Sequence, residues 1–228
     1  MKRHPFPLKS LAAAVLLCVA SGAQAQIDVY TDRTAFLAAV GGYGVDTYDD
    51  LTVQLYESPF ARSAGSYGYT ASAESGLYGA GSGGDGWLTP NVDNEAVTFS
   101  NFAPGIVGFG SYFFGSDING AFVPNGTLQF TAMDGSTLNY TLTGATTTSF
   151  VGFVSSSPLA SVSLISGGDY WATANDVTLA MPIPEPETYA MMMLGLGVVG
   201  WMRRRRGMAR LLFFLRPGPL APPHAPLL

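Results

Sequence analysis

The sequence predicts an all-β fold, an antiparallel β-sandwich over residues 26–182, and three observations favour it. Short segments of alternating apolar and polar residues recur between residues 96 and 180. Turns rich in Gly, Asn and Asp separate them, and glycine makes up 28 of the 228 residues. Only one segment of this region has helical periodicity. About 155 residues are enough to bury a two-sheet core.

The first elements are expected to be a strand at residues 27–30 and a short helix directly after it. Thr31 or Asp32 would cap the helix, and Gly41-Gly42 would end it. Three apolar residues of the helix would share one face: Phe36, Leu37 and Val40. The glycine-rich residues 62–90 are expected to form loops and short ragged strands.

The strand pattern becomes regular after Pro90. Strands are expected at residues 96–102, 106–114, 127–133, 137–143, 149–154, 161–165 and 176–180. The second of these segments is the most continuously apolar, so we expect it in the centre of a sheet. Asp134-Gly135 predicts a hairpin turn between the third and fourth segments.

Charge excludes several classes of function. Residues 27–181 contain 14 acidic residues, only Arg33 and Arg62 as basic residues, and no Lys, His or Cys. This body lacks the cationic surface that nucleic-acid binding needs. It also lacks the residues for Ser-His-Asp or Cys-His catalysis, histidine-ligated zinc and disulfides. Chemistry is left to carboxylates, hydroxyls, amides and aromatic rings, and we expect that the protein is not an enzyme.

The N-terminus has the pattern of a secretory signal peptide over residues 1–25. Lys2, Arg3 and Lys9 precede an uncharged apolar run at residues 11–20. Ala23 and Ala25 fit the small-x-small rule for cleavage by signal peptidase. The alternative is a short N-terminal anchor, but the run is well below the ~20 residues that a membrane span needs.

The C-terminal region combines three features in order. Pro184-Glu185-Pro186 is followed by an apolar stretch at residues 190–202 and then by four consecutive arginines, Arg203, Arg204, Arg205 and Arg206. These features predict a rigid spacer, a short transmembrane helix and a positive cytoplasmic stop. The body would then lie outside the membrane, transiently anchored to the inner membrane.

This segment, residues 183–206, resembles the PEP-CTERM sorting signal. The resemblance implies an exported protein of a Gram-negative bacterium that makes extracellular polysaccharide. It also implies that an exosortase recognises Pro184, Glu185 and Pro186 and processes the tail. Residues 207–228 depart from the family pattern, because such signals normally end soon after the arginines. This Pro-rich tail is expected to be disordered, either as a reading-frame extension or as a cytoplasmic tail.

Parts of the body resemble ectodomains that are common among PEP-CTERM proteins. The similar pieces are Asp49-Asp50-Leu51, residues 108–114 and residues 170–179. The resemblance implies a jelly-roll-like sandwich, similar to many carbohydrate-binding modules, without identifying a ligand.

No cofactor is expected to be required, but structural calcium has a candidate site. Ca²⁺ binds carboxylate and amide oxygens. Asp49 and Asp50 lie near an early strand, and Asn175 and Asp176 open the last predicted strand, so pairing of those strands would bring them together. In the alternative interpretation, which we favour, all four are ordinary turn residues.

Aromatic residues offer candidate platforms for a polysaccharide. Tyr112, Tyr170 and Trp171 form one candidate set, and Trp87 with Tyr78 forms another. The alternative is that these rings pack in the core or at its rim, which is the commoner role of aromatic residues in a sandwich.

The functional expectation is therefore a non-enzymatic, exosortase-sorted surface or matrix protein of an exopolysaccharide biofilm, with a structural or adhesive role. A carbohydrate-binding module, with or without structural calcium, is the alternative. Glycan hydrolysis is less favoured because it needs two carboxylates at a defined separation. No spacing singles out a pair among Glu57, Glu74 and Glu95, the glutamates of the body.

Overall fold

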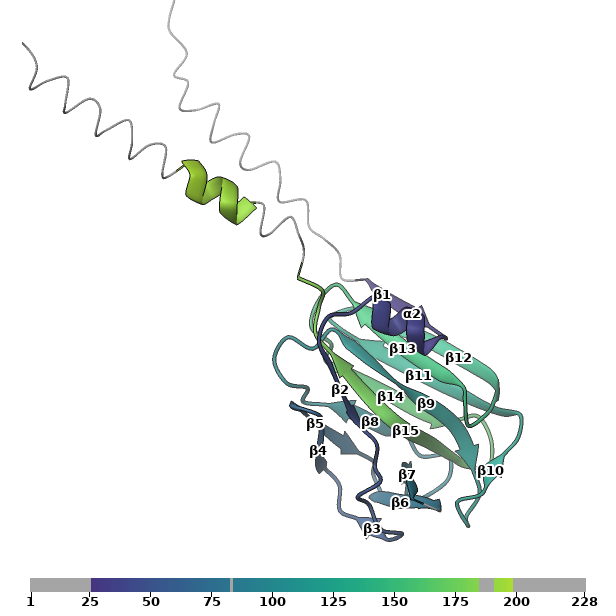
Figure 1. The fold of residues 1–228 in the computed structure, drawn as a ribbon. Coiled ribbons are helices and arrows are strands. Elements are labelled where there is room, and N and C mark those ends of the chain that lie inside the picture. Colours follow the sequence, from purple (N-terminus) through teal and green to yellow (C-terminus); the bar gives the residue numbers. More distant parts are fainter. Residues whose placement is uncertain (1–25, 83, 185–190, 199–228) are drawn as a thin grey trace, which may run out of the picture. The chain divides into compact units, whose positions relative to one another are not determined.

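The computed structural model describes residues 26–82, 84–184 and 191–198 (Figure 1). The chain divides into two compact units, residues 1–183 and residues 184–228. The division lies one residue from the predicted end of the body. The predicted signal peptide, with Ala23 and Ala25, and the Pro-rich tail lie outside the described residues.

The described part of the first unit is an all-β sandwich of two antiparallel sheets, as the sequence predicts. The first sheet has nine strands, in the order β1 (Ile27–Tyr30), β13 (Phe150–Ser155), β9 (Gly108–Ser116), β15 (Trp171–Ala180), β7 (Asp85–Pro90), β6 (Leu77–Ser82) and β3 (Leu55–Tyr56), with β10 (Phe122–Val123) beside β9 and β2 (Tyr43–Asp46) beside β15. The second has six, in the order β12 (Thr137–Ala145), β11 (Gly126–Met133), β14 (Ser161–Ser166), β8 (Val97–Ser100), β5 (Tyr67–Ser72) and β4 (Phe60–Ala64).

Eight strands pair in a nested order. β7 pairs with β15, β8 with β14, β9 with β13, and β11 with β12. Successive strands β7, β8 and β9 alternate between the two sheets, as do β13, β14 and β15. The chain thus forms one long antiparallel hairpin that is wound around the core.

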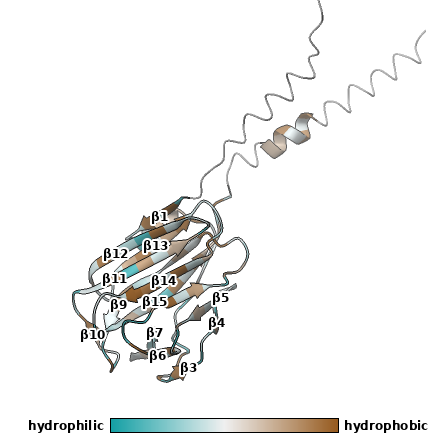
Figure 2. Cartoon of the chain, turned by 180° about the vertical axis from the view of Figure 1, so that it is seen from behind, coloured by the Kyte–Doolittle hydropathy of each residue, from teal (hydrophilic) through white to brown (hydrophobic). Residues whose placement is uncertain are grey.

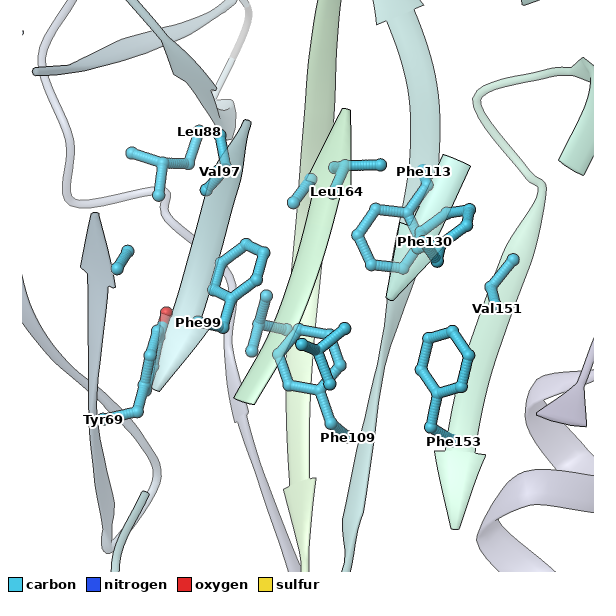
Figure 3. Packing of buried hydrophobic residues seen from close by; sticks show 14 of the residues in the cluster. Tyr69, Leu88, Val97, Phe99, Phe109, Phe113, Phe130, Val151, Phe153 and Leu164 are labelled. Carbon is cyan, nitrogen blue, oxygen red and sulfur yellow. The ribbon is translucent and has the colours of Figure 1, made fainter. Parts of the chain in front are cut away.

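Phenylalanines supply most of the large aromatic side chains that are buried in the core between the sheets. Phe113 of β9 and Phe130 of β11 meet edge to face with ring centroids 4.9 Å apart, and Phe99 lies 4.9 Å from Phe109 (Figure 3). Each pair joins one sheet to the other. Figure 2 shows hydrophobic and hydrophilic residues interspersed along the strands, as expected when each strand has only one face in this core.

The predicted short helix is confirmed as α2 (Arg33–Ala38). Asp32 is its N-cap, and the Asp32 Oδ1 atom accepts a hydrogen bond from the amide of Ala35. Phe36 is fully buried in a second apolar cluster with Phe150 on the outer face of the nine-stranded sheet. A Cβ atom on Gly152 would lie 2.5 Å from the Phe36 ring, so the glycine makes room for the helix.

The interpretation of residues 62–90 as loops with ragged strands was wrong. Four regular strands, β4 to β7, occupy this region, and β6 pairs with β7 over six residue pairs. The error came from glycine, which weakens the strand pattern but permits close approach of other backbone. Gly86 illustrates this, because a Cβ atom there would lie 2.3 Å from the Tyr48 carbonyl oxygen.

Candidate functional site

A cleft of about 340 Å³ lies on the outer face of the nine-stranded sheet. It is lined by residues from β6, β7, β9 and β15, from the loop between β9 and β10, and from the segments just before β3 and just after β7: Val53, Tyr78, Ala80, Gly81, Thr89, Asn91, Ser116, Asp117, Ile118, Asn119, Gly120 and Trp171. No Lys or Arg is among them. The lining combines two aromatic side chains with amides, hydroxyls and one carboxylate.

Strand alternation places the two aromatic residues on this face. In β15, Ala172 and Ala174 point into the core, so Trp171 points to the opposite side. In β6, Leu77 is in the core and Tyr78 faces outward with Thr89 of β7 as its cross-strand partner. Trp171 and Tyr78 are half-buried, which holds the rings while leaving part of each exposed.

One wall of the cleft is a hydrogen-bonded loop. The Asp117 Oδ1 atom accepts hydrogen bonds from the amides of Asn119 and Ala121, both at 2.8 Å. The amide of Gly120 also donates to the Asp117 carbonyl, at 2.9 Å. These bonds hold the backbone of this loop, and Asn119 is an exposed residue of the loop that lines the cleft.

Neighbouring aromatic residues pack on the same sheet face. Trp87 of β7 meets Phe114 of β9 edge to face at 5.5 Å, and Phe114 meets Phe122 of β10 at 6.2 Å. The Trp87 Nε1 atom is buried and has no hydrogen-bond partner within the described residues. The two residues of the candidate pair therefore differ in position: Tyr78 lines the cleft, whereas Trp87 packs against Phe114 and is not part of the lining.

The first candidate platform is not assembled as one surface. Of its three residues only Trp171 lines the cleft. The Tyr170 hydroxyl donates to the Thr127 carbonyl at 2.7 Å, and a Cβ atom on Gly115 would lie 2.7 Å from the Tyr170 ring. Tyr112 packs 5.6 Å from Phe150, beside α2. Tyr112 and Tyr170 thus have packing roles.

The calcium candidates are engaged in other bonds. Asp50 forms an ion pair with Arg62 at 2.7 Å, and Asp49 accepts a hydrogen bond from the Gly86 amide at 3.0 Å. The Asn175 amide donates to Asp85 at 2.9 Å. Residues 26–82, 84–184 and 191–198 contain no group of three or more His, Cys, Asp or Glu side chains arranged to hold a metal ion. Calcium binding stays a prediction.

Asp176 occupies a different place from the one that the sequence suggested. It does not open the last strand but lies within β15, where the pairing with β9 shifts register and the Asp176 backbone has a φ of +57°. Burial, and then the charge of nearby Asp85, raise the pKa of the Asp176 carboxyl above its ordinary value.

A buried polar network, which the sequence did not indicate, closes one edge of the sandwich. Arg62 of β4 donates from Nε to Asp46 of β2 at 2.9 Å, and the Tyr69 hydroxyl donates to the same carboxylate at 2.7 Å. The Tyr48 hydroxyl lies 2.8 Å from that of Tyr69. Burial raises the pKa of both tyrosines, so both stay neutral hydrogen-bonding groups.

The C-terminal unit is described only in part. Pro184 is exposed, whereas Glu185, Pro186 and Arg203 to Arg206 lie outside the described residues. Residues 191–198 are helical and carry exposed Met and Leu side chains. Among the described residues, no helix combines the length and the apolar character that membrane crossing requires, so the predicted transmembrane helix is not confirmed.

Comparison with known proteins supports the sorting motif. Residues 182–206 match the family model described as the PEP-CTERM protein-sorting motif, which confirms the resemblance seen in the sequence. No curated protein matches the chain. One similar solved structure is a family 6 carbohydrate-binding module, with 14% identity, a TM-score of 0.27, and coverage of 57% of this chain and 95% of that one. The matched motif marks the chain as an exported protein of the exosortase-sorted kind.

Proposed function

We propose that the protein binds a neutral glycan at the cell surface or in the extracellular matrix of a Gram-negative biofilm former, and acts there as a structural or adhesive component. The sorting motif at residues 182–206 would deliver the sandwich to that place. The cleft that contains Trp171 and Tyr78 would then hold the polysaccharide.

The observation that carries this proposal is the composition of the cleft. The half-buried rings of Trp171 and Tyr78 can stack on the apolar faces of sugar rings, while Asn91 and Asn119 can bond their hydroxyl groups. Asp117 is the one charged residue of the lining. An acidic glycan would meet this carboxylate and no basic residue of the lining, so a neutral glycan is the better match.

Binding without catalysis is favoured by the position of the carboxylates. Glycoside hydrolysis uses two carboxyl groups roughly 5 to 9.5 Å apart. Glu57, Glu74 and Glu95 are not part of the cleft lining, and the Asp117 Oδ1 atom already accepts two backbone hydrogen bonds. We therefore assign the cleft to a non-enzymatic binding module that requires no cofactor.

The nested strand order supports a jelly-roll-like description of this module. A jelly roll has eight antiparallel strands in two sheets. The pairs formed by β7, β8, β9 and β11 with their later partners supply eight such strands, and the remaining strands extend the two sheets.

Titration calorimetry of the full chain with neutral and acidic polysaccharides from a biofilm-forming host tests the binding site. We expect the Trp171→Ala variant to bind the neutral polysaccharide at least ~10-fold more weakly, because an aromatic anchor is lost. Tyr43 is a matched control, since it is half-exposed on β2 and is not part of the cleft lining. Equal binding by Trp171→Ala and Tyr43→Ala would exclude the cleft.

Fractionation of the native host with and without its exosortase tests delivery. We expect the body in the matrix, with a C-terminus near Pro184 by mass spectrometry, and uncut chain in the membrane when the exosortase is absent. Persistence of the chain through Leu228 in both strains would contradict sorting.

A further inference from the structure

The described sheets end in strands that differ in length and protection. The nine-stranded sheet ends in β1, of four residues, and in β3, of two. The six-stranded sheet ends in β4 and β12, at opposite ends (Figure 1). β4 is covered by β2, whose Val45 carbonyl accepts a hydrogen bond from the Gly65 amide at 3.2 Å. β12, with nine residues, is the long uncovered edge among the described strands.

β12 lacks the usual protection of an edge strand. Natural edge strands avoid pairing with other chains through charged side chains, Pro, bulges or short length. Residues 137–145 contain no charged residue and no Pro, although the body around them is strongly acidic. Residues 137–143 pair with β11 in unbroken register, and the irregularity begins only beyond Thr143.

The two faces of β12 differ in a way that favours a like partner. Leu138, Tyr140 and Leu142 are half-buried and pack at the margin of the core. Asn139 and Thr141 are exposed on the opposite face. A second strand beside β12 would cover the half-buried apolar residues if it offered apolar residues on the same face. It would hydrogen-bond with Asn139 and Thr141 if it offered polar residues on the opposite face.

We propose that β12 is the contact between two copies of this chain, which pair antiparallel around a two-fold axis at Tyr140. In this register Leu138 lies opposite the partner's Leu142, and Asn139 lies opposite the partner's Thr141. In this register even-numbered residues lie opposite even-numbered ones, and odd-numbered residues lie opposite odd-numbered ones. Apolar residues therefore meet apolar residues on one face, and polar residues meet polar ones on the other. No like charges oppose each other, and the six-stranded sheets of the two copies become one continuous sheet.

Disulfide trapping in the exported full chain tests this register. Cys18 is the one cysteine of the sequence, so a Cys18→Ser background reports only introduced thiols. We expect co-expressed Asn139→Cys and Thr141→Cys chains to form a mixed disulfide dimer on non-reducing gels. Gln129→Cys replaces Thr141→Cys in the control, because Gln129 is the β11 neighbour of Thr141. It lies one strand spacing, about 4.8 Å, further from the partner, too far for a disulfide.

A charge experiment distinguishes edge pairing from other association. In Asn139→Lys/Thr141→Lys, lysines oppose each other across the proposed contact, and we expect the dimer to be lost. Gln129→Lys/Met133→Lys puts two lysines at exposed positions of β11, one strand away from the edge, and should leave the dimer intact. Loss in both variants would assign the contact to the face of the sheet. Absence of the mixed disulfide, or no loss in either variant, would overturn the proposal.

Discussion

The two edges of the six-stranded sheet are built by opposite means. At the β4 edge, β2 of the other sheet lies against β4. The Arg62–Asp46 ion pair joins the two strands, and its side chains are 11% (Arg62) and 4% (Asp46) exposed. At the β12 edge, a long uncharged strand has no covering element within the described residues. One edge is thus closed within the chain by buried polar groups, whereas no described strand other than β11 pairs with β12 at the other edge.

The largest effect is expected from removal of the closing cation. Arg62→Met leaves the Asp46 carboxylate buried without its ion-pair partner, so the free energy of unfolding should fall by about 3–5 kcal/mol. Chemical denaturation measures this loss. The double variant Asp46→Leu/Arg62→Met removes both charges and should recover a large part of the stability. A small loss in the single variant would mean that the network does not close the edge.

The close approach of β2 to β4 gives the next prediction. A Cβ atom at Gly44 would lie 2.1 Å from the Ala64 carbonyl oxygen, so Gly44→Ala must push the two strands apart. We expect a loss of about 1–3 kcal/mol in the same denaturation experiment. Gly68→Ala on β5 is the control, because its Cβ atom would lie 4.0 Å from the Arg62 carbonyl oxygen. Equal losses in both variants would indicate a general cost of replacing glycine.

Acid should weaken the closed edge by a smaller amount. Hydrogen bonds from Arg62 lower the pKa of the Asp50 carboxyl, so ionised Asp50 adds stability above the pKa of an unfolded Asp, about 3.9. That contribution is lost as the pH falls through the lowered folded-state pKa. Melting curves of the native chain and Asp50→Asn should therefore differ at neutral pH and converge below about pH 4. The effect is small because Asp50 is 67% exposed. A constant difference down to pH 2 would contradict this role.

The smallest effect is expected at the open edge. Thr141 is exposed on β12, so Thr141→Lys should change the free energy of unfolding of the dilute chain by no more than about 0.5 kcal/mol. Denaturation at low protein concentration measures it without a contribution from association. A much larger loss would show that another part of the chain covers β12.

Sequence reasoning succeeded where structure depends on neighbours along the chain. The Asp134-Gly135 hairpin joins β11 and β12 as predicted, because the turn residues and both alternating strands are adjacent in sequence. The helix was predicted for the same reason, and of the two predicted cap candidates, Thr31 and Asp32, the structure has Asp32. The last strand was predicted five residues too short, because Asn175 and Asp176 were placed at its start, whereas both lie within β15.

The all-β class, the regular strands after Pro90 and the PEP-CTERM motif at residues 182–206 could be predicted from the sequence, because each is a local pattern. Which aromatic residues line a cleft and which pack depends on the folded chain. There, Trp171 and Tyr78 line one cleft, Tyr112 packs elsewhere, and Asp50 forms an ion pair with Arg62 rather than a site with Asn175 and Asp176. The physical reason is that cross-strand neighbours in a nested sandwich come from distant parts of the chain, and their meeting depends on strand register and face.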